Sequence, residues 1–203
     1  MLDFTQDIRE AGLIFEDRGY SIVGSPLAFG KVVHGTGPNK FTAHLKPFSA
    51  SYLNNKMILS LNNFLSQTTV LDVDDYELTK TIFNKLGLNL DSLVSSTMSW
   101  YGQPNRRKLI YNGINIPLNI CSVRYNNKTV FEFKGATLPG VPGPENVYTY
   151  YDLAPPTIHS KTKQPYTFIT KLFYKNELPE FPNTLLNIWK NWEQEKDNLL
   201  KLF

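Results

Sequence analysis

The sequence contains very little cysteine and histidine. Its 203 residues include one cysteine, Cys121, and three histidines. A single cysteine excludes an intramolecular disulfide framework and a zinc site built from several cysteines. We therefore expect Cys121 to be a buried thiol in a protein of a reducing compartment.

Long hydrophobic runs are absent as well. No stretch approaches the length of about 20 consecutive apolar residues that a membrane-spanning helix needs. The first seven residues, MLDFTQD, have neither the basic nor the apolar segment of a signal peptide. These absences predict a cytoplasmic protein with no membrane partner.

The composition and length are those of a globular protein. Hydrophobic residues make up 41% of the chain and charged residues 19%, and the length fits one large domain or two small lobes. The net charge is only +3, but residues 92–175 contain ten basic and three acidic residues, a local charge of +7. Such clustering attracts phosphate groups; the alternative is an ordinary solvated lysine surface.

Hydrophobic periodicity predicts helices and strands along the whole chain. Apolar residues at helical spacing indicate a helix over 4–18, a second one that starts after residue 75 and ends at Gly87, and a third from about residue 183. Strands are expected at 20–23, 57–61, 68–74, 95–101, 108–111, 129–134, 148–151 and 166–169. This mixture predicts an α+β (or α/β) fold. Neither GxGxxG nor GxxxxGK[ST] occurs, so nucleotide binding by those loops is not supported.

Two acidic residues stand at the end of the strand expected over 68–74, which is rich in β-branched residues. Asp72 and Asp74 are two positions apart, so a strand points both side chains to one face. Two adjacent carboxylates repel each other unless a cation lies between them, and Mg²⁺ and Mn²⁺ prefer such oxygen ligands. Glu132, within an apolar strand, is a candidate third ligand. The alternatives are a turn at Asp72, helix capping by Asp74 or Asp75, and a solvent-facing Glu132; we expect Asp75 to be the cap.

Basic residues gather at a turn and in a proline-containing loop. Two of the five arginines are adjacent in the run QPNRRK at 103–108, and arginine binds phosphate bidentately. The prolines at 155 and 156 fix a loop that presents further polar residues. The candidate contacts for phosphate or nucleic acid are Arg106, Arg107, Lys108, Thr157, His159, Lys161 and Lys163, together with Lys31, Lys40 and Lys46 of an earlier loop. A solvated basic surface is the alternative.

Taken in order, these segments resemble the primase-polymerase (prim-pol) domain of the archaeo-eukaryotic primase superfamily, in the form carried by phages and plasmids. Residues 69–74 (TVLDVD) resemble the first acidic motif, and residues 102–111 (GQPNRRKLIY) the glycine-led turn with its following strand. Residues 130–135 (VFEFKG), with the later segments APPTIH and KQPY, resemble the third motif and its proline-histidine loop. The resemblance covers residues 4–170.

The resemblance implies a two-lobed, primase-like catalytic core with an RRM-like sheet over residues 1–175 and a C-terminal helical extension over 176–203. It implies a DNA primase/polymerase that joins nucleoside triphosphates on a single-stranded DNA template, in the host cytoplasm if a phage encodes it. Any helicase would then be a separate chain or a missing part of a longer protein. In the implied site, two Mg²⁺ or Mn²⁺ ions are held by Asp72, Asp74 and Glu132, the triphosphate is contacted by Arg106, Arg107 and Lys108, and Thr157 and His159 lie beside it.

One departure from the family pattern keeps two alternatives open. The second motif usually places a histidine on the strand after the turn, whereas here that strand contains Lys108 and no histidine. The departure favours a non-catalytic module that binds single-stranded DNA or a replication origin. A metal-dependent nuclease also fits two acids, a later glutamate and nearby basic residues.

Overall fold

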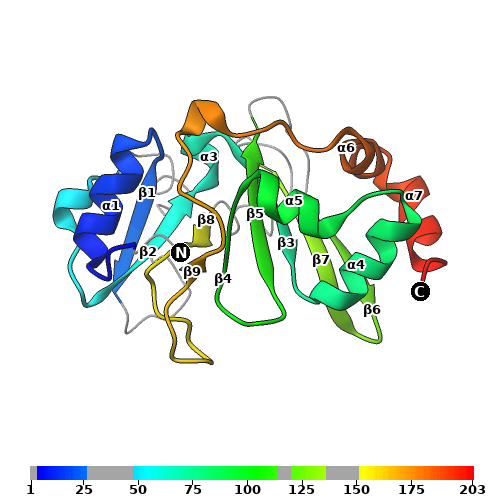
Figure 1. The fold of residues 1–203 in the computed structure, drawn as a ribbon, viewed down its shortest axis with the longest axis horizontal. Helices are drawn as coiled ribbons and strands as arrows, with labels where there is room; N and C mark the ends of the chain where they lie inside the picture. Colours follow the sequence, from blue (N-terminus) through cyan, green and yellow to red (C-terminus); the bar gives the residue numbers. More distant parts are fainter. Residues whose placement is uncertain (1–3, 27–47, 114–119, 136–150) are drawn as a thin grey trace, which may run out of the picture.

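The computed structural model describes residues 4–26, 48–113, 120–135 and 151–203. Within these ranges the chain forms two antiparallel sheets and six α-helices, so the α+β prediction is confirmed (Figure 1). Lys31, Lys40 and Lys46 lie outside the described residues. No helix within these ranges has the length and apolar character to cross a membrane.

The larger sheet has six strands, all paired antiparallel. Their order is β6 (Cys121–Tyr125), β7 (Lys128–Lys134), β3 (Thr68–Val73), β5 (Arg107–Asn112), β4 (Met98–Tyr101) and β9 (Thr167–Phe168). All six residues of β3 are buried, because β3 lies within the sheet and both of its faces are covered. The site described below lies at one end of this strand.

One face of the large sheet packs against four helices. Alternate residues of the central strands, such as Leu71, Leu109 and Phe133, point to this side and form one core. It is covered by α4 (Tyr76–Lys85), α5 (Leu90–Ser96), α6 (Asn183–Lys190) and α7 (Trp192–Leu200) (Figure 1). Cys121 belongs to this core at 7% exposure, so the prediction of a buried thiol is confirmed, and burial raises the pKa of this thiol to about 11.

The opposite face packs against the smaller sheet. Val70, Trp100 and Ile110 form a second core with residues of that sheet. The small sheet has the order β1 (Ile22–Pro26), β2 (Met57–Asn62) and β8 (Tyr151–Leu153). It is accompanied by α1 (Ile8–Asp17), α3 (Asn63–Ser66) and the 3₁₀ turn η3 (Ala50–Tyr52); a second 3₁₀ turn, η5 (Lys175–Glu177), leads toward α6 (Figure 1).

Most predicted elements are present, with several differences. The short helix α3 was not predicted, and residues 148–150 of the strand predicted over 148–151 lie outside the described residues. Asp75 caps α4 as expected, since its carboxylate accepts a hydrogen bond from the backbone N–H of Leu78. The strand predicted over 95–101 starts only at residue 98, because α5 occupies 90–96 behind its own cap, Asn89. Strand β6 was not predicted, and the C-terminal helix is two helices that meet at Asn191.

The C-terminal helices are part of the main core. Trp189 is 2% exposed and stacks on Phe133 of β7 with ring centroids 5.5 Å apart. Residues 176–203 therefore cover the large sheet rather than extend away from it.

Replacement of Trp189 by alanine is expected to destabilise the fold by about 3–5 kcal/mol, because it leaves a cavity beside Phe133. Leu200→Ala on α7, where the side chain is 46% exposed, is the control and should change the free energy of unfolding by about 0.5 kcal/mol or less. Urea denaturation measures both values. Equal effects of the two substitutions would contradict this packing.

Candidate functional site

The candidate site is built on the register of three adjacent strands. On β3, Asp72 lies opposite Lys108 of β5 on one side and opposite Glu132 of β7 on the other. Cross-strand partners share one face, and Lys134 shares it because it is two residues from Glu132. This is the face that the small sheet covers, so four charged side chains point into the space between the two sheets.

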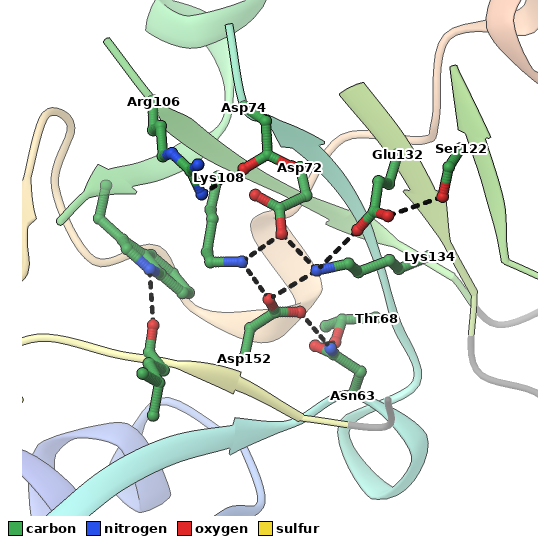
Figure 2. Close-up of polar contacts among 12 residues, drawn as sticks. Asn63, Thr68, Asp72, Asp74, Arg106, Lys108, Ser122, Glu132, Lys134 and Asp152 are labelled. Carbon is green, nitrogen blue, oxygen red and sulfur yellow. Dashed lines mark hydrogen bonds and ion pairs between the residues drawn. The ribbon is translucent and has the colours of Figure 1, made fainter. Parts of the chain in front are cut away.

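Four side chains form a closed ring of alternating charge, which we call the charge ring: Asp72, Lys108, Asp152 and Lys134 (Figure 2). The Lys108 ammonium lies 2.6 Å from Oδ2 of Asp72 and also pairs with Oδ1 of Asp152. The Lys134 ammonium pairs with the same Asp72 oxygen and lies 3.5 Å from Oδ1 of Asp152.

The charge ring joins the two sheets. Asp152 belongs to β8 of the small sheet, whereas the other three members belong to the large sheet. The second oxygen of Asp152 accepts a hydrogen bond of 2.8 Å from the Asn63 amide, whose own oxygen accepts one of 2.9 Å from the Thr68 hydroxyl. Asp152 is therefore fixed from both sides, and it fixes the two ammonium groups in turn.

Burial and mutual attraction set the protonation of the ring. The side chain of Asp152 is 3% exposed, and those of the other members are 12–13% exposed. Burial alone would raise the pKa of both carboxyls, but the charges of Lys108 and Lys134 outweigh it and hold the pKa of Asp72 and Asp152 below the usual range. Burial opposes charge on the lysines too, yet the two carboxylates raise the pKa of both. All four groups are charged near neutral pH.

Two further acids lie beside the charge ring. Glu132 accepts a hydrogen bond of 2.6 Å from Ser122 and lies 3.6 Å from the Lys134 ammonium. Asp74 pairs with Arg106 at 2.5 Å. Burial raises the pKa of Asp74, and the negative charges of Asp72 and Glu132 raise it further. Asp74 is thus close enough to Asp72 and to Glu132 to be repelled by both carboxylates.

A cavity of about 200 Å³ opens at this point between the sheets. All four members of the charge ring line it, together with both arginines of the turn and His159. Three tyrosines complete this part of the lining: Tyr101, Tyr151 and Tyr166. Arg107 is held by the carbonyl oxygens of Pro104 and Arg106 at 2.6 and 2.7 Å and lies over the ring of Tyr76. The cavity wall is therefore rich in cations with fixed positions.

His159 forms another part of the wall. Its Nδ1 accepts hydrogen bonds of 3.2 Å from the backbone N–H groups of Lys161 and Thr162, and its Nε2 lies 3.1 Å from the side-chain amide of Gln103. Gly102 is required here, because an added Cβ would lie 2.5 Å from the ring of Tyr166 and 2.8 Å from that of His159. The glycine lets the end of β4 approach the proline loop.

The cavity is lined by five of the predicted residues: Asp72, Arg106, Arg107, Lys108 and His159. Asp74 and Glu132 lie beside it and are not part of its lining. Thr157 does not reach the cavity: its hydroxyl is fully buried between the backbone N–H and C=O of Leu59, at 2.7 and 2.8 Å, so it anchors the loop to β2. The expectation that it lies beside a nucleotide is corrected accordingly. Lys161 and Lys163 are exposed on the turn after His159.

The acids match a divalent metal in the chemistry of their donor atoms. Asp72, Asp74 and Glu132 supply carboxylate oxygens from neighbouring strands, which suits a hard cation such as Mg²⁺ or Mn²⁺. Both lysine contacts of Asp72 use Oδ2, so Oδ1 carries neither of them. Among the described residues, no three acidic, histidine or cysteine side chains lie close enough together to hold a metal ion. For a divalent ion to bind, Asp72 and Asp74 would have to exchange a lysine or arginine partner for the metal.

Asp152 is the main residue that sequence reasoning missed. It is the only acidic residue between Glu145 and Glu177, and it stands in the apolar frame YYDLA. That isolation was a usable signal, because an acid inside an apolar strand needs a buried partner. Sequence reasoning also assigned no role to Lys134.

No known family model matches the chain, and no curated protein sequence matches it either. The geometry of the site therefore carries the functional argument.

Replacement of Asp72 by asparagine is expected to reduce the dependence of the free energy of unfolding on pH in the acid range. The folded chain holds the pKa of Asp72 below its ordinary 3.8, so the ionised carboxylate stabilises the fold above about pH 4, and this contribution is lost as the pH falls through the folded-state value. At pH 7 the variant should lose less than the about 3–5 kcal/mol typical of breaking a buried pair, because both lysines keep Asp152.

Thermal unfolding between pH 2 and 7 measures the effect. The difference in midpoint between wild type and Asp72→Asn should shrink as the pH falls. Asp197→Asn on exposed α7 is the matched control. A difference that stays constant with pH would show that the carboxylate is not held in its ionised form.

Proposed function

We propose that this chain is a template-dependent nucleotidyltransferase of the primase-polymerase type, which joins nucleoside triphosphates on single-stranded DNA. One observation carries the proposal: Asp72 lines a cavity whose wall also contains Arg106 and Lys108, and two further acids lie beside it. Asp74 is paired with Arg106, and Glu132 lies opposite Asp72 on the neighbouring strand. Acids that favour divalent cations and bases that favour phosphate meet at one place, as transfer of a nucleotide to a 3′-hydroxyl requires.

Each group of side chains has a distinct task in this proposal. Arg106, Arg107 and Lys108 bind and orient the triphosphate, and the leaving pyrophosphate remains against them. Asp72, Asp74 and Glu132 are the ligands for divalent ions. When bound, such ions activate the attacking hydroxyl and offset the charge that develops on the phosphate oxygens. Tyr101 and Tyr166 offer flat surfaces at the same cavity.

The arrangement of the sheets supports a primase-like core for this function. The antiparallel β7–β3–β5–β4 strands with helices on one face suit an RRM-like sheet, and the small sheet with α1 suits the first lobe of a two-lobed domain. The cavity lies between the two.

A second candidate is a non-catalytic module that binds single-stranded DNA. The strand on which the family usually has a histidine contains none here, and the ammonium of Lys108 on that strand pairs with Asp72. A carboxylate neutralised by lysine needs no metal for stability. The exposed Lys161 and Lys163 would then provide backbone contacts without chemistry.

One assay separates the candidates. The protein is incubated with a single-stranded template, labelled nucleotides and Mg²⁺ or Mn²⁺, with and without a primer. New or elongated strands support the proposed activity, shortened strands indicate a nuclease, and retention of DNA without a change in length indicates a binding module.

Asp74→Asn and Glu132→Gln are expected to abolish strand synthesis, with a loss of about a hundredfold or more, because a metal stabilises the transferring phosphate by several kcal/mol. DNA binding should be largely retained, since basic residues provide the backbone contacts. Asp197→Asn is the control. Primer extension and gel-shift assays measure the two properties, and full synthesis by either site variant would rule out the acid assignment.

DNA binding is expected to weaken steeply with salt through counterion release. For single strands the slope of log K against log salt is about −0.7 for each phosphate contacted, so Lys161→Gln/Lys163→Gln should make the slope less steep by about 1.4. Lys190→Gln/Lys201→Gln, on the C-terminal helices, removes the same charge as a control. Fluorescence anisotropy at several salt concentrations measures the slopes. Equal changes in both double variants would show that the loop lysines do not contact the strand.

A further inference from the structure

The charge ring contains one member whose purpose the proposed function leaves open. Asp152 comes from the small sheet and contacts both lysines, yet it faces the cavity from the side opposite Asp74 and Glu132 in Figure 2. It is 3% exposed and held by Asn63. A buried carboxylate held in a fixed position changes the electrostatic potential that every ligand meets in the cavity.

The charges of the ring cancel only because Asp152 is present. Asp72 and Asp152 contribute two negative charges, and Lys108 and Lys134 contribute two positive charges. Without Asp152, one carboxylate would face two ammonium groups. The cavity would then attract phosphate more strongly and divalent cations less strongly, since both effects follow from the same excess positive charge.

We propose that Asp152 is a positioning and selectivity residue: it holds Lys108 and Lys134 as internal counter-ions and keeps the cavity from being filled by a phosphate chain that arrives without its divalent cation. The inference deepens the proposed function, because it rests on the cavity as the triphosphate site. It acts through the two lysines, and no bond of the substrate is made or broken at Asp152.

The test uses binding alone, with inorganic tripolyphosphate and Mn²⁺ as separate probes of the full chain. Asp152→Asn keeps the size of the side chain and an oxygen for Asn63. The variant should bind tripolyphosphate about tenfold more tightly and Mn²⁺ about tenfold more weakly than the wild type. Isothermal titration calorimetry measures the first affinity, and the electron paramagnetic resonance signal of free Mn²⁺ measures the second.

The affinities for tripolyphosphate and Mn²⁺ are expected to change in opposite directions, which separates this role from a purely structural one. A variant that merely loosens the cavity would bind both probes more weakly. A parallel loss, unchanged affinities, or no tripolyphosphate binding by either protein would each overturn the inference. Asp197→Asn removes the same charge from exposed α7 and should leave both affinities unchanged. Because no template or turnover is involved, failure of the strand-synthesis assay with these binding results intact would count against the proposed function and not against Asp152.

A mirrored variant covers the case in which Asp152→Asn fails to fold, which circular dichroism would reveal. Lys134→Gln removes a positive charge from the same ring, so Mn²⁺ should bind about tenfold more tightly and tripolyphosphate more weakly. Weaker or unchanged Mn²⁺ binding by a folded Lys134→Gln chain would overturn the inference.

Discussion

The charge ring is completed only by the docking of the two sheets. A lone charge in this space would be costly to bury, and removal of one partner of a buried pair leaves the other uncompensated. Three members belong to the large sheet, and Asp152 belongs to the small one. Docking of the small sheet therefore supplies the carboxylate that balances the second lysine of the ring.

The apolar contacts around the ring explain why it forms at this place. Val70, two residues before Asp72 on β3, packs into the core between the sheets, as does Ile110, two residues after Lys108 on β5. The same alternation that points these apolar side chains toward the small sheet also points the charged ones there. The charge ring is the polar end of a hydrophobic interface, and the cavity begins where the apolar side chains stop.

The pair of acids at the end of β3 could be predicted from the sequence because a strand fixes which side chains share a face. That argument applies within one strand, so it placed Asp72 and Asp74 on one face, whereas Glu132 was expected beside them only from the family resemblance; in the structure Glu132 lies opposite Asp72. Asp152 escaped it, because β8 pairs with β2, more than ninety residues earlier, in the other sheet. Local patterns carry no information on such a pairing. Thr157 failed for the same reason, since Leu59 takes up its hydroxyl.

The fold elements that the sequence missed have weak local signals. Residues 90–96, LDSLVSS, are short and rich in serine, which is a poor helix former, yet Asn89 caps them and Leu90 and Val94 pack into the core. Strand β6 reaches β7 through Asn126 and Asn127, both with positive φ, so the pair Asn-Asn was a hairpin signal. In both cases the turn or cap residue was more informative than the hydrophobic pattern.

The balance of charge in the ring also bears on what the cavity can accept. A bare phosphate chain that drew Lys108 and Lys134 away would leave Asp72 and Asp152 buried and uncompensated, and a bare divalent cation would do the same to the lysines. A triphosphate accompanied by its divalent cation offers partners to both signs at once. The four side chains can exchange partners with such a ligand without leaving a net buried charge, which is the physical reason that a self-neutralised ring is compatible with nucleotidyl transfer.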